Sequence, residues 1–153
     1  TLFIFTSDHT SLKENKRYKT MNGKYLIPLI MYAPGDSNIK GIDSSLVSQI
    51  DIVPSIIDYL GIKDTVSSFG RSVFKEIKNR YHYNYFKGQY YILNDKFLLV
   101  SNGENNKALY LYKNDIFLKE NVVDKYTLEA DSLKSVLQAI IKQYNYRLIN
   151  NKL

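Results

Sequence analysis

An aspartate and a histidine stand side by side just after the first apolar segment of the chain. The run Leu2–Phe5 contains no polar residue, and Ser7, Asp8 and His9 follow it almost at once. A short apolar run of this kind is typical of a strand buried on both faces, as in the parallel sheets of α/β proteins. Ligand-binding and catalytic groups gather at the carboxyl ends of such strands. The position of Asp8 and His9 therefore predicts a metal-binding or acid–base pair.

A carboxylate oxygen and an imidazole nitrogen are ligands that suit Zn²⁺ and Mn²⁺, and neighbouring residues converge on one ion where the backbone turns sharply. A metal site needs about four ligands, and the rest of the sequence offers few. His82, the only other histidine, lies in a tyrosine-rich segment without an acidic neighbour, and we interpret it as a structural or exposed residue. The absence of cysteine excludes thiolate ligands and disulfide bonds.

The chain carries a net charge of +6, which suits an anionic partner such as phosphate, nucleic acid or an acidic membrane surface. Its densest basic cluster is Lys13, Lys16, Arg17 and Lys19, in the polar loop that follows the aspartate–histidine pair. Lys13, Lys16 and Arg17 are candidates for binding a substrate phosphate. A solvated loop is the competing interpretation, because clusters this small are common on protein surfaces.

The elements that must position these residues follow from the apolar pattern. A chain of 153 residues with 44% hydrophobic residues has the size of one domain with a single core. A second apolar run over residues 26–33 predicts another buried strand. Residues 45–61 predict a helix with Asp51 as its N-cap, Pro54 in its first turn and Gly61 just past its end. The apolar residues that recur at helical spacing and should face the sheet are Ile52, Ile56, Ile57 and Leu60.

The second half of the chain has a different pattern. Short strands are predicted at residues 81–85, 89–93, 96–101 and 108–112, and turn signals at hairpin distances separate them. Consecutive strands with short turns imply a small antiparallel sheet. A long amphipathic helix is expected from about Leu128. The apolar stripe that should pack it on a sheet is Leu133, Val136, Leu137, Ile140, Ile141, Tyr144 and Leu148.

Several segments in order resemble the sulfatase branch of the alkaline phosphatase superfamily. These segments are residues 1–9, 25–35 and 48–62, followed by the glycine loop 68–72. Within the branch, the sequence looks closest to lipoteichoic acid synthase-like phosphoglycerol transferases. The resemblance implies the C-terminal part of an alkaline-phosphatase-like α/β sandwich with a small antiparallel sheet and a long C-terminal helix. Residues 1–78 would belong to the α/β core, and residues 79–153 would form the antiparallel subdomain with its closing helix.

The resemblance further implies that Asp8 and His9 are two ligands of a catalytic divalent metal (Mn²⁺, Zn²⁺, Mg²⁺ or Ca²⁺). In the family, the other ligands and the threonine, serine or formylglycine nucleophile come from segments before this strand. The implied partner is therefore a missing N-terminal part of the same protein, and the chain by itself is expected to be inactive. Attack by the nucleophile would give a covalent phospho- or sulfo-enzyme, later resolved by water or an acceptor alcohol.

The implied substrates are phosphoglycerol, phosphoethanolamine or sulfate esters, met at the periplasmic or extracellular face of the cytoplasmic membrane. No apolar stretch in the chain approaches the roughly 20 residues of a membrane anchor, so an anchor is expected only in the parent protein. Sulfatases usually have glycine where this chain has Thr10. Residues 7–15 also resemble lipid A phosphoethanolamine transferases, which carry a further histidine shortly downstream, whereas this chain has Lys16-Arg17-Tyr18-Lys19. The substrate headgroup therefore stays open.

A non-catalytic binding module is the alternative function. Tyr81, Tyr83 and Tyr85 would share one face of a strand, with Tyr90 and Tyr91 on the next. Such rings stack on nucleobases or sugars, helped by positive charge. We favour the interpretation that they fill the core of the subdomain, and we expect no nucleic-acid partner.

Overall fold

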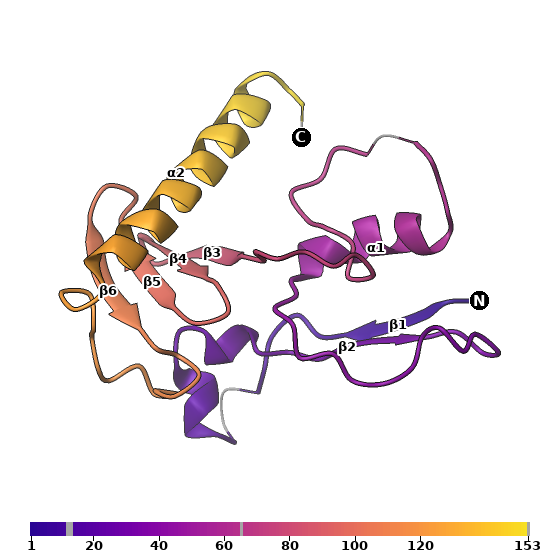
Figure 1. The fold of residues 1–153 in the computed structure, drawn as a ribbon, viewed down its shortest axis with the longest axis horizontal. Helices are drawn as coiled ribbons and strands as arrows, with labels where there is room; N and C mark the ends of the chain where they lie inside the picture. Colours follow the sequence, from indigo (N-terminus) through magenta and orange to yellow (C-terminus); the bar gives the residue numbers. More distant parts are fainter. Residues whose placement is uncertain (12–13, 65, 153) are drawn as a thin grey trace.

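The computed structural model describes residues 1–11, 14–64 and 66–152 as an α/β protein with two antiparallel sheets and a long C-terminal helix (Figure 1). The two-stranded sheet pairs β1 (Phe3–Thr6) with β2 (Leu29–Tyr32). The four-stranded sheet contains β3 (His82–Phe86), β4 (Gln89–Leu93), β5 (Leu98–Ser101) and β6 (Asn106–Tyr110) in sequence order. The helices are α1 (Ile52–Tyr59) and α2 (Thr127–Ile149), with 3-10 turns η1 (Lys16–Lys19), η2 (Gly23–Tyr25) and η3 (Gln49–Asp51). The α/β class, the antiparallel sheet and the closing helix are confirmed.

Local turn chemistry explains why the second half forms hairpins. Lys87 and Gly88 both have positive φ angles, 52° and 79°, as a two-residue hairpin turn requires, and Phe86 pairs with Gln89 across it. At the next turn, the side-chain oxygen of Asn94 accepts hydrogen bonds from the backbone N–H groups of Lys96 and Phe97. The strands therefore form within a few residues of their predicted positions.

The main core lies between the four-stranded sheet and α2. Ile92, Leu99 and Leu109 project from three neighbouring strands toward Leu133 and Leu137 of the helix, and all five are 3% exposed or less. This contact follows from period-2 alternation in the strands and helical spacing in α2. The predicted stripe is confirmed in its N-terminal part. Further along the helix, Tyr144 and Leu148 are 47% and 53% exposed, where α2 extends beyond the sheet (Figure 1).

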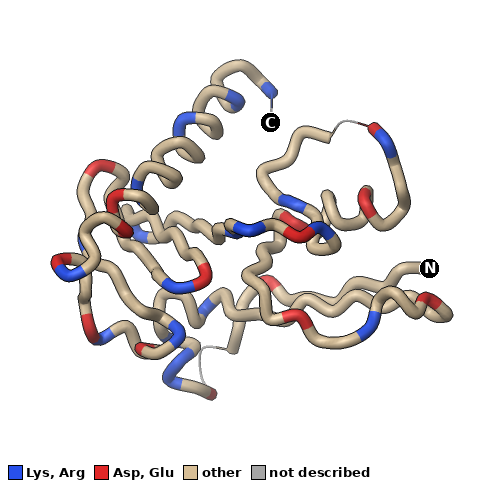
Figure 2. The backbone as a smooth tube through the Cα atoms, in the orientation of Figure 1, with Lys and Arg blue, Asp and Glu red and all other residues tan. Residues whose placement is uncertain are grey.

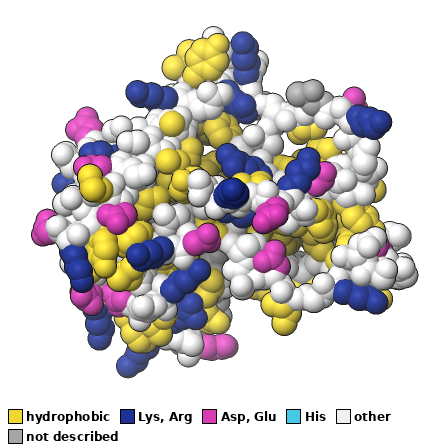
Figure 3. All heavy atoms as spheres, viewed as in Figure 1, with side chains coloured by type: hydrophobic (Ala, Val, Ile, Leu, Met, Phe, Trp, Pro, Cys, Tyr) yellow, Lys and Arg dark blue, Asp and Glu magenta, His cyan; other side chains and the backbone are white. Residues whose placement is uncertain are grey.

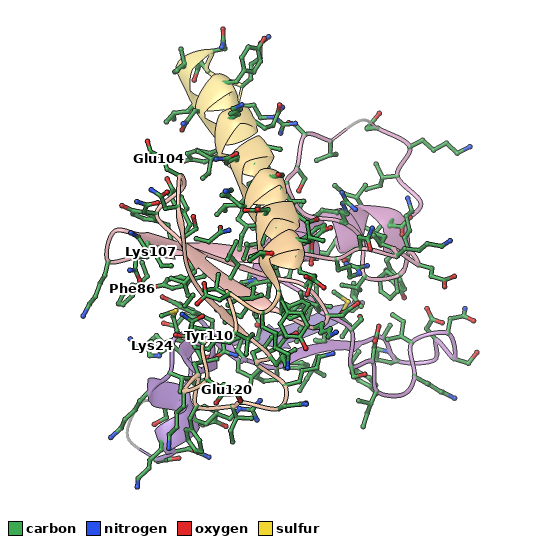
Figure 4. The ribbon with its side chains drawn as sticks, turned by 60° about the vertical axis from the view of Figure 1, so that its left-hand side comes forward. Lys24, Phe86, Glu104, Lys107, Tyr110 and Glu120 are labelled. Carbon is green, nitrogen blue, oxygen red and sulfur yellow. The ribbon has the colours of Figure 1, made fainter. Side chains whose placement is uncertain are left out.

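The opposite face of the sheet is covered by the first half of the chain. Tyr91, Leu98 and Val100 form a second buried cluster, against which Met21 and Leu46 pack. Phe86 packs against the same cluster, and the Lys24 ammonium lies 4.6 Å from the centre of its ring. Figure 4 labels both residues. The two predicted regions, 1–78 and 79–153, are thus in direct contact; the boundary between them stays a prediction.

The strands β1 and β2 differ from the expectation of parallel strands buried on both faces. They pair antiparallel, with Phe3 opposite Tyr32 and Phe5 opposite Ile30, and these four side chains are between 43% and 55% exposed. The prediction was wrong for the described part of the chain, because no described element covers the face that carries these residues. Apart from Ala33, every buried apolar residue described lies between Tyr91 and Leu137.

Helix α1 ends as the sequence predicts but begins differently. Its C-terminus is a Schellman motif, in which Ile62 N–H bonds the Ile57 carbonyl and Gly61, at φ 64°, bonds the Asp58 carbonyl. At the start, Asp51 makes no side-chain cap to α1. Asp51 does stand at the N-cap position of α1, but its side chain acts as the N3 residue of a capping box whose N-cap is Ser48. The predicted position is therefore confirmed, and the expected cap to α1 is replaced by one to η3.

The apolar face of α1 is less buried than its spacing predicts. Ile52, Ile56 and Ile57 are half-buried, and Leu60 is 59% exposed. Within the described residues, the first half of the chain therefore contains apolar surface on both its sheet and its helix that is only partly covered.

Candidate metal-binding site

Asp8 and His9 lie directly beyond the carboxyl end of β1 and point toward the same space. The Asp8 Oδ2 and His9 Nε2 atoms are 3.4 Å apart, and the two side chains are 84% and 63% exposed, respectively. The other carboxylate oxygen of Asp8 accepts the backbone N–H of His9 at 2.9 Å. This hydrogen bond is the main cause of a lowered Asp8 pKa, with the His9 charge as a weaker cause. Asp8 is therefore ionised at neutral pH, as a metal ligand must be.

The imidazole of His9 is oriented by its own neighbourhood. Its Nδ1 atom lies 2.9 Å from the Thr10 carbonyl oxygen, an acceptor that favours the tautomer with hydrogen on Nδ1. In that neutral tautomer, the lone pair of Nε2 lies on the side of the Asp8 carboxylate. A histidine with one nitrogen bonded to a carbonyl and the other free is the usual arrangement of a metal ligand, so the two residues fit a divalent cation.

The loop that carries the pair is fixed on both sides. Thr10 is buried, its N–H bonds the Lys24 carbonyl, and its hydroxyl lies within hydrogen-bond distance of the Gly23 and Lys24 carbonyls. On the other side, the Gln49 amide donates to the Ser7 carbonyl at 2.7 Å. The threonine that replaces the usual glycine of sulfatases thus anchors this loop to η2.

The described residues bring no third ligand to this pair. No group of three or more histidine, aspartate or glutamate side chains suited to a metal occurs in the described ranges. The two ligands proposed from the sequence are therefore the only part of a metal site that we can place on the described residues.

The basic candidates lie further along the loop. Lys16 is exposed and Arg17 half-buried, both in η1, and none of the described hydrogen bonds or ion pairs joins them to Asp8 or His9. Lys13 lies outside the described residues. Lysine and arginine occur along most of the backbone (Figure 2), and acidic side chains lie among them on the face seen in Figure 3. A role for Lys13, Lys16 and Arg17 in binding substrate stays a prediction.

A buried polar network joins the two halves of the chain and was missed from the sequence. The carboxylate of Asp51, 7% exposed as a residue, accepts the N–H groups of Ser48 at 2.9 Å and Arg71 at 2.7 Å. The Arg80 guanidinium lies 3.8 Å from the same carboxylate. The Ser48 hydroxyl in turn bonds Nδ1 of His82. The spacing Ser48-x-x-Asp51 is a capping-box signal that could have identified the first of these contacts.

His82 is a structural residue, which was one of the two interpretations, structural or exposed, made from the sequence. Burial lowers its pKa, and the Asp51 charge opposes this only in part, so the imidazole is neutral near pH 7.

The glycine loop, residues 68–72, is fixed to α1 and to the turn before it by a hydrogen bond and a close backbone approach. The Ser72 hydroxyl donates to Asp58 at 2.6 Å, and a Cβ at Gly70 would overlap the backbone carbonyl of Ile50.

The tyrosines divide between core and surface. Tyr81, Tyr83 and Tyr90 pack against the cluster under α2, and Tyr91 is buried in the opposite cluster. Tyr85 is 58% exposed and its ring centre lies 4.7 Å from that of Tyr90. The core interpretation is thus confirmed for four of these rings, whereas Tyr85 faces solvent.

Residues 1–62, which contain β1, β2, α1 and the Asp8–His9 pair, match the sulfatase family model. The match supports the resemblance to the sulfatase branch of the alkaline phosphatase superfamily over this part of the chain. No curated protein matches the chain. In the described residues, no helix combines the length and apolar character needed to cross a membrane.

Proposed function

We propose that this chain supplies part of the active site of a metal-dependent enzyme of the sulfatase type, which transfers or hydrolyses a phosphate or sulfate ester. The observation that carries the proposal is the Asp8–His9 pair: two convergent ligand atoms at the end of β1, inside the segment that matches the sulfatase model. The ester classes that fit the resemblance are phosphoglycerol, phosphoethanolamine and sulfate esters. Within that range, the proposal favours a phosphoglycerol transferase.

The residues of the chain would have distinct tasks. Asp8 and His9 Nε2 would hold a divalent cation, which supplies Lewis-acid activation and neutralises charge on the transferred group. The Thr10 carbonyl would keep His9 in the tautomer that leaves Nε2 free. Thr10 and Gln49 would keep the loop in one position while substrate binds. The nucleophile and the remaining ligands would come from an N-terminal part of the same protein.

The exposed apolar surface supports such a partner. Phe3, Phe5, Ile30 and Tyr32 form one face of the β1–β2 pair and are all more than 40% exposed, and contiguous apolar faces of this kind mark contact surfaces. The enzyme would act at the periplasmic or extracellular face of the cytoplasmic membrane.

Activity of the full-length protein tests the proposal. The protein is treated with chelator, reloaded with Mn²⁺, Zn²⁺, Mg²⁺ or Ca²⁺, and assayed on p-nitrophenyl sulfate, p-nitrophenyl phosphate and phosphatidylglycerol. We expect metal-dependent turnover and a loss of about 100-fold or more in Asp8→Asn and His9→Gln, because each removes a ligand. Asp64→Asn changes an exposed aspartate in the loop after α1 and should leave the rate unchanged.

The preferred ester identifies the branch. Release of diacylglycerol from phosphatidylglycerol supports the assignment as a phosphoglycerol transferase. Turnover of the sulfate ester alone would instead assign the enzyme as a sulfatase. Full activity in both Asp8→Asn and His9→Gln would refute the proposed ligand roles.

A further inference from the structure

A cavity of about 410 Å³ lies between the β3–β4 hairpin, the C-terminal half of α2 and the loop that follows α1. Its size is within the range of small-molecule sites, about 300–1,000 Å³. Tyr85 and Tyr90 form one wall, with their rings 4.7 Å apart between centres. Phe69 and Tyr144 form another, 6.2 Å apart. The cavity therefore presents aromatic rings from three separate segments of the chain.

The wall contributed by the loop is held in place by α2. The Arg147 guanidinium lies 4.8 Å from the centre of the Phe69 ring and donates a hydrogen bond to the Ser67 hydroxyl at 2.6 Å. These contacts hold Phe69 against the helix and give the Arg147 guanidinium two partners on the loop. The cavity is thus formed before any ligand arrives.

Polar groups in the cavity remain available for a ligand. Among the described residues, the hydroxyls of Tyr83, Tyr85, Tyr90 and Tyr144 make no hydrogen bond, nor does the Asn145 amide. The Asn84 amide uses only its oxygen, which accepts the N–H of Tyr85. The lining thus offers flat aromatic faces together with hydroxyl and amide groups at their edges.

The charge of the lining decides between classes of ligand. None of the described residues that line the cavity is Lys, Arg, Asp or Glu. Binding of nucleic acid depends on cations that neutralise phosphates, so this lining does not suit a polyanion. A purely apolar chain would leave the hydroxyls and amides without partners, which is costly. A neutral sugar satisfies both requirements, because its C–H faces pack on aromatic rings and its hydroxyls bond phenols and amides.

We propose that this cavity binds a neutral saccharide. The proposal does not depend on the Asp8–His9 pair. Tyr85 and Tyr144, which are both about half exposed, would cover the sugar from opposite walls.

Calorimetric titration of the full-length protein with maltohexaose, cellohexaose and chitohexaose tests the proposal, with a single-stranded oligothymidylate as the anionic comparison. We expect at least one hexasaccharide to bind with a Kd near or below about 1 mM. Tyr85→Ala and Tyr144→Ala should each weaken binding about five- to tenfold, because each removes one aromatic face. Tyr146→Ala is the matched control, a 55% exposed tyrosine on α2 outside the lining, and should bind as the wild type does.

Circular dichroism and the unfolding midpoint check that each variant is folded, and Tyr85→Phe, which keeps the ring, should retain most of the affinity. Asp8→Asn should bind saccharide normally, so this test and the activity test can fail separately. The proposal is overturned if none of the three hexasaccharides binds, if folded Tyr85→Ala and Tyr144→Ala bind as tightly as wild type, or if only the oligonucleotide binds.

Discussion

Replacing Asp51 by asparagine changes a buried carboxylate to a neutral amide of nearly the same shape. The carboxylate accepts two backbone N–H groups, from Ser48 and Arg71, on its two different oxygens. Asparagine has only one oxygen, so its NH₂ group must face one of these donors. The Arg80 guanidinium also loses its carboxylate partner, and the side chains of Arg80 and Asp51 are only 9% and 11% exposed, respectively.

The magnitude follows from these losses. A buried donor left without an acceptor costs about 1–3 kcal/mol. Breaking a buried ion pair costs about 3–5 kcal/mol when the remaining charge has no other partner. Arg80 retains the Ser72 and Lys75 carbonyls as acceptors, so its share should be smaller. We expect Asp51→Asn to lower the free energy of unfolding by about 2–4 kcal/mol.

Urea unfolding followed by circular dichroism measures this change. Asp64→Asn, at an exposed position, should stay within about 0.5 kcal/mol of wild type. The double variant Asp51→Asn/Arg80→Met should lose less free energy of unfolding than the sum of the losses of the two single variants, because both changes remove the same contact. A loss below about 1 kcal/mol in Asp51→Asn would contradict the stabilising role of the network.

Three other changes test separate contacts. Gly70→Ala places a Cβ against the Ile50 carbonyl and should lower the free energy of unfolding by about 1–3 kcal/mol in urea denaturation. Thr10→Val removes the hydroxyl hydrogen bonds to η2 and should lower it by about 1–3 kcal/mol; an unchanged midpoint would contradict the anchoring role. Because burial holds the pKa of His82 below 6.5 in the folded state, the unfolded chain binds more protons just below that pH. This contribution to stability is therefore lost as the pH falls through 6.5 toward the folded pKa. Between about pH 7.5 and 5.5, the free energy of unfolding of His82→Gln should decrease less than that of the wild type. The same pH dependence in both proteins would contradict this role of His82.

Local sequence signals were sufficient for the second half of the chain. Lys87-Gly88 defines a hairpin by its turn geometry alone, and α2 follows from apolar spacing that suits any sheet beneath it. They were not sufficient for β1 and β2, since an apolar run does not specify its neighbour or its direction. The Ser48-x-x-Asp51 spacing could have indicated the capping box, but it could not indicate the contacts of Asp51 with Arg71 and Arg80, which reach its carboxylate from positions 20 and more residues away.

The sequence by itself determined the α/β class, the hairpins, the closing helix and the Asp8–His9 pair as candidate ligands, because each depends on residues that are neighbours along the chain. Only the tertiary structure decided the antiparallel pairing of β1 with β2, the Asp51 network and the aromatic cavity. Each of these brings together segments separated by tens of residues, such as Phe69 and Tyr144. Such contacts depend on how the elements pack against one another, which no local pattern records.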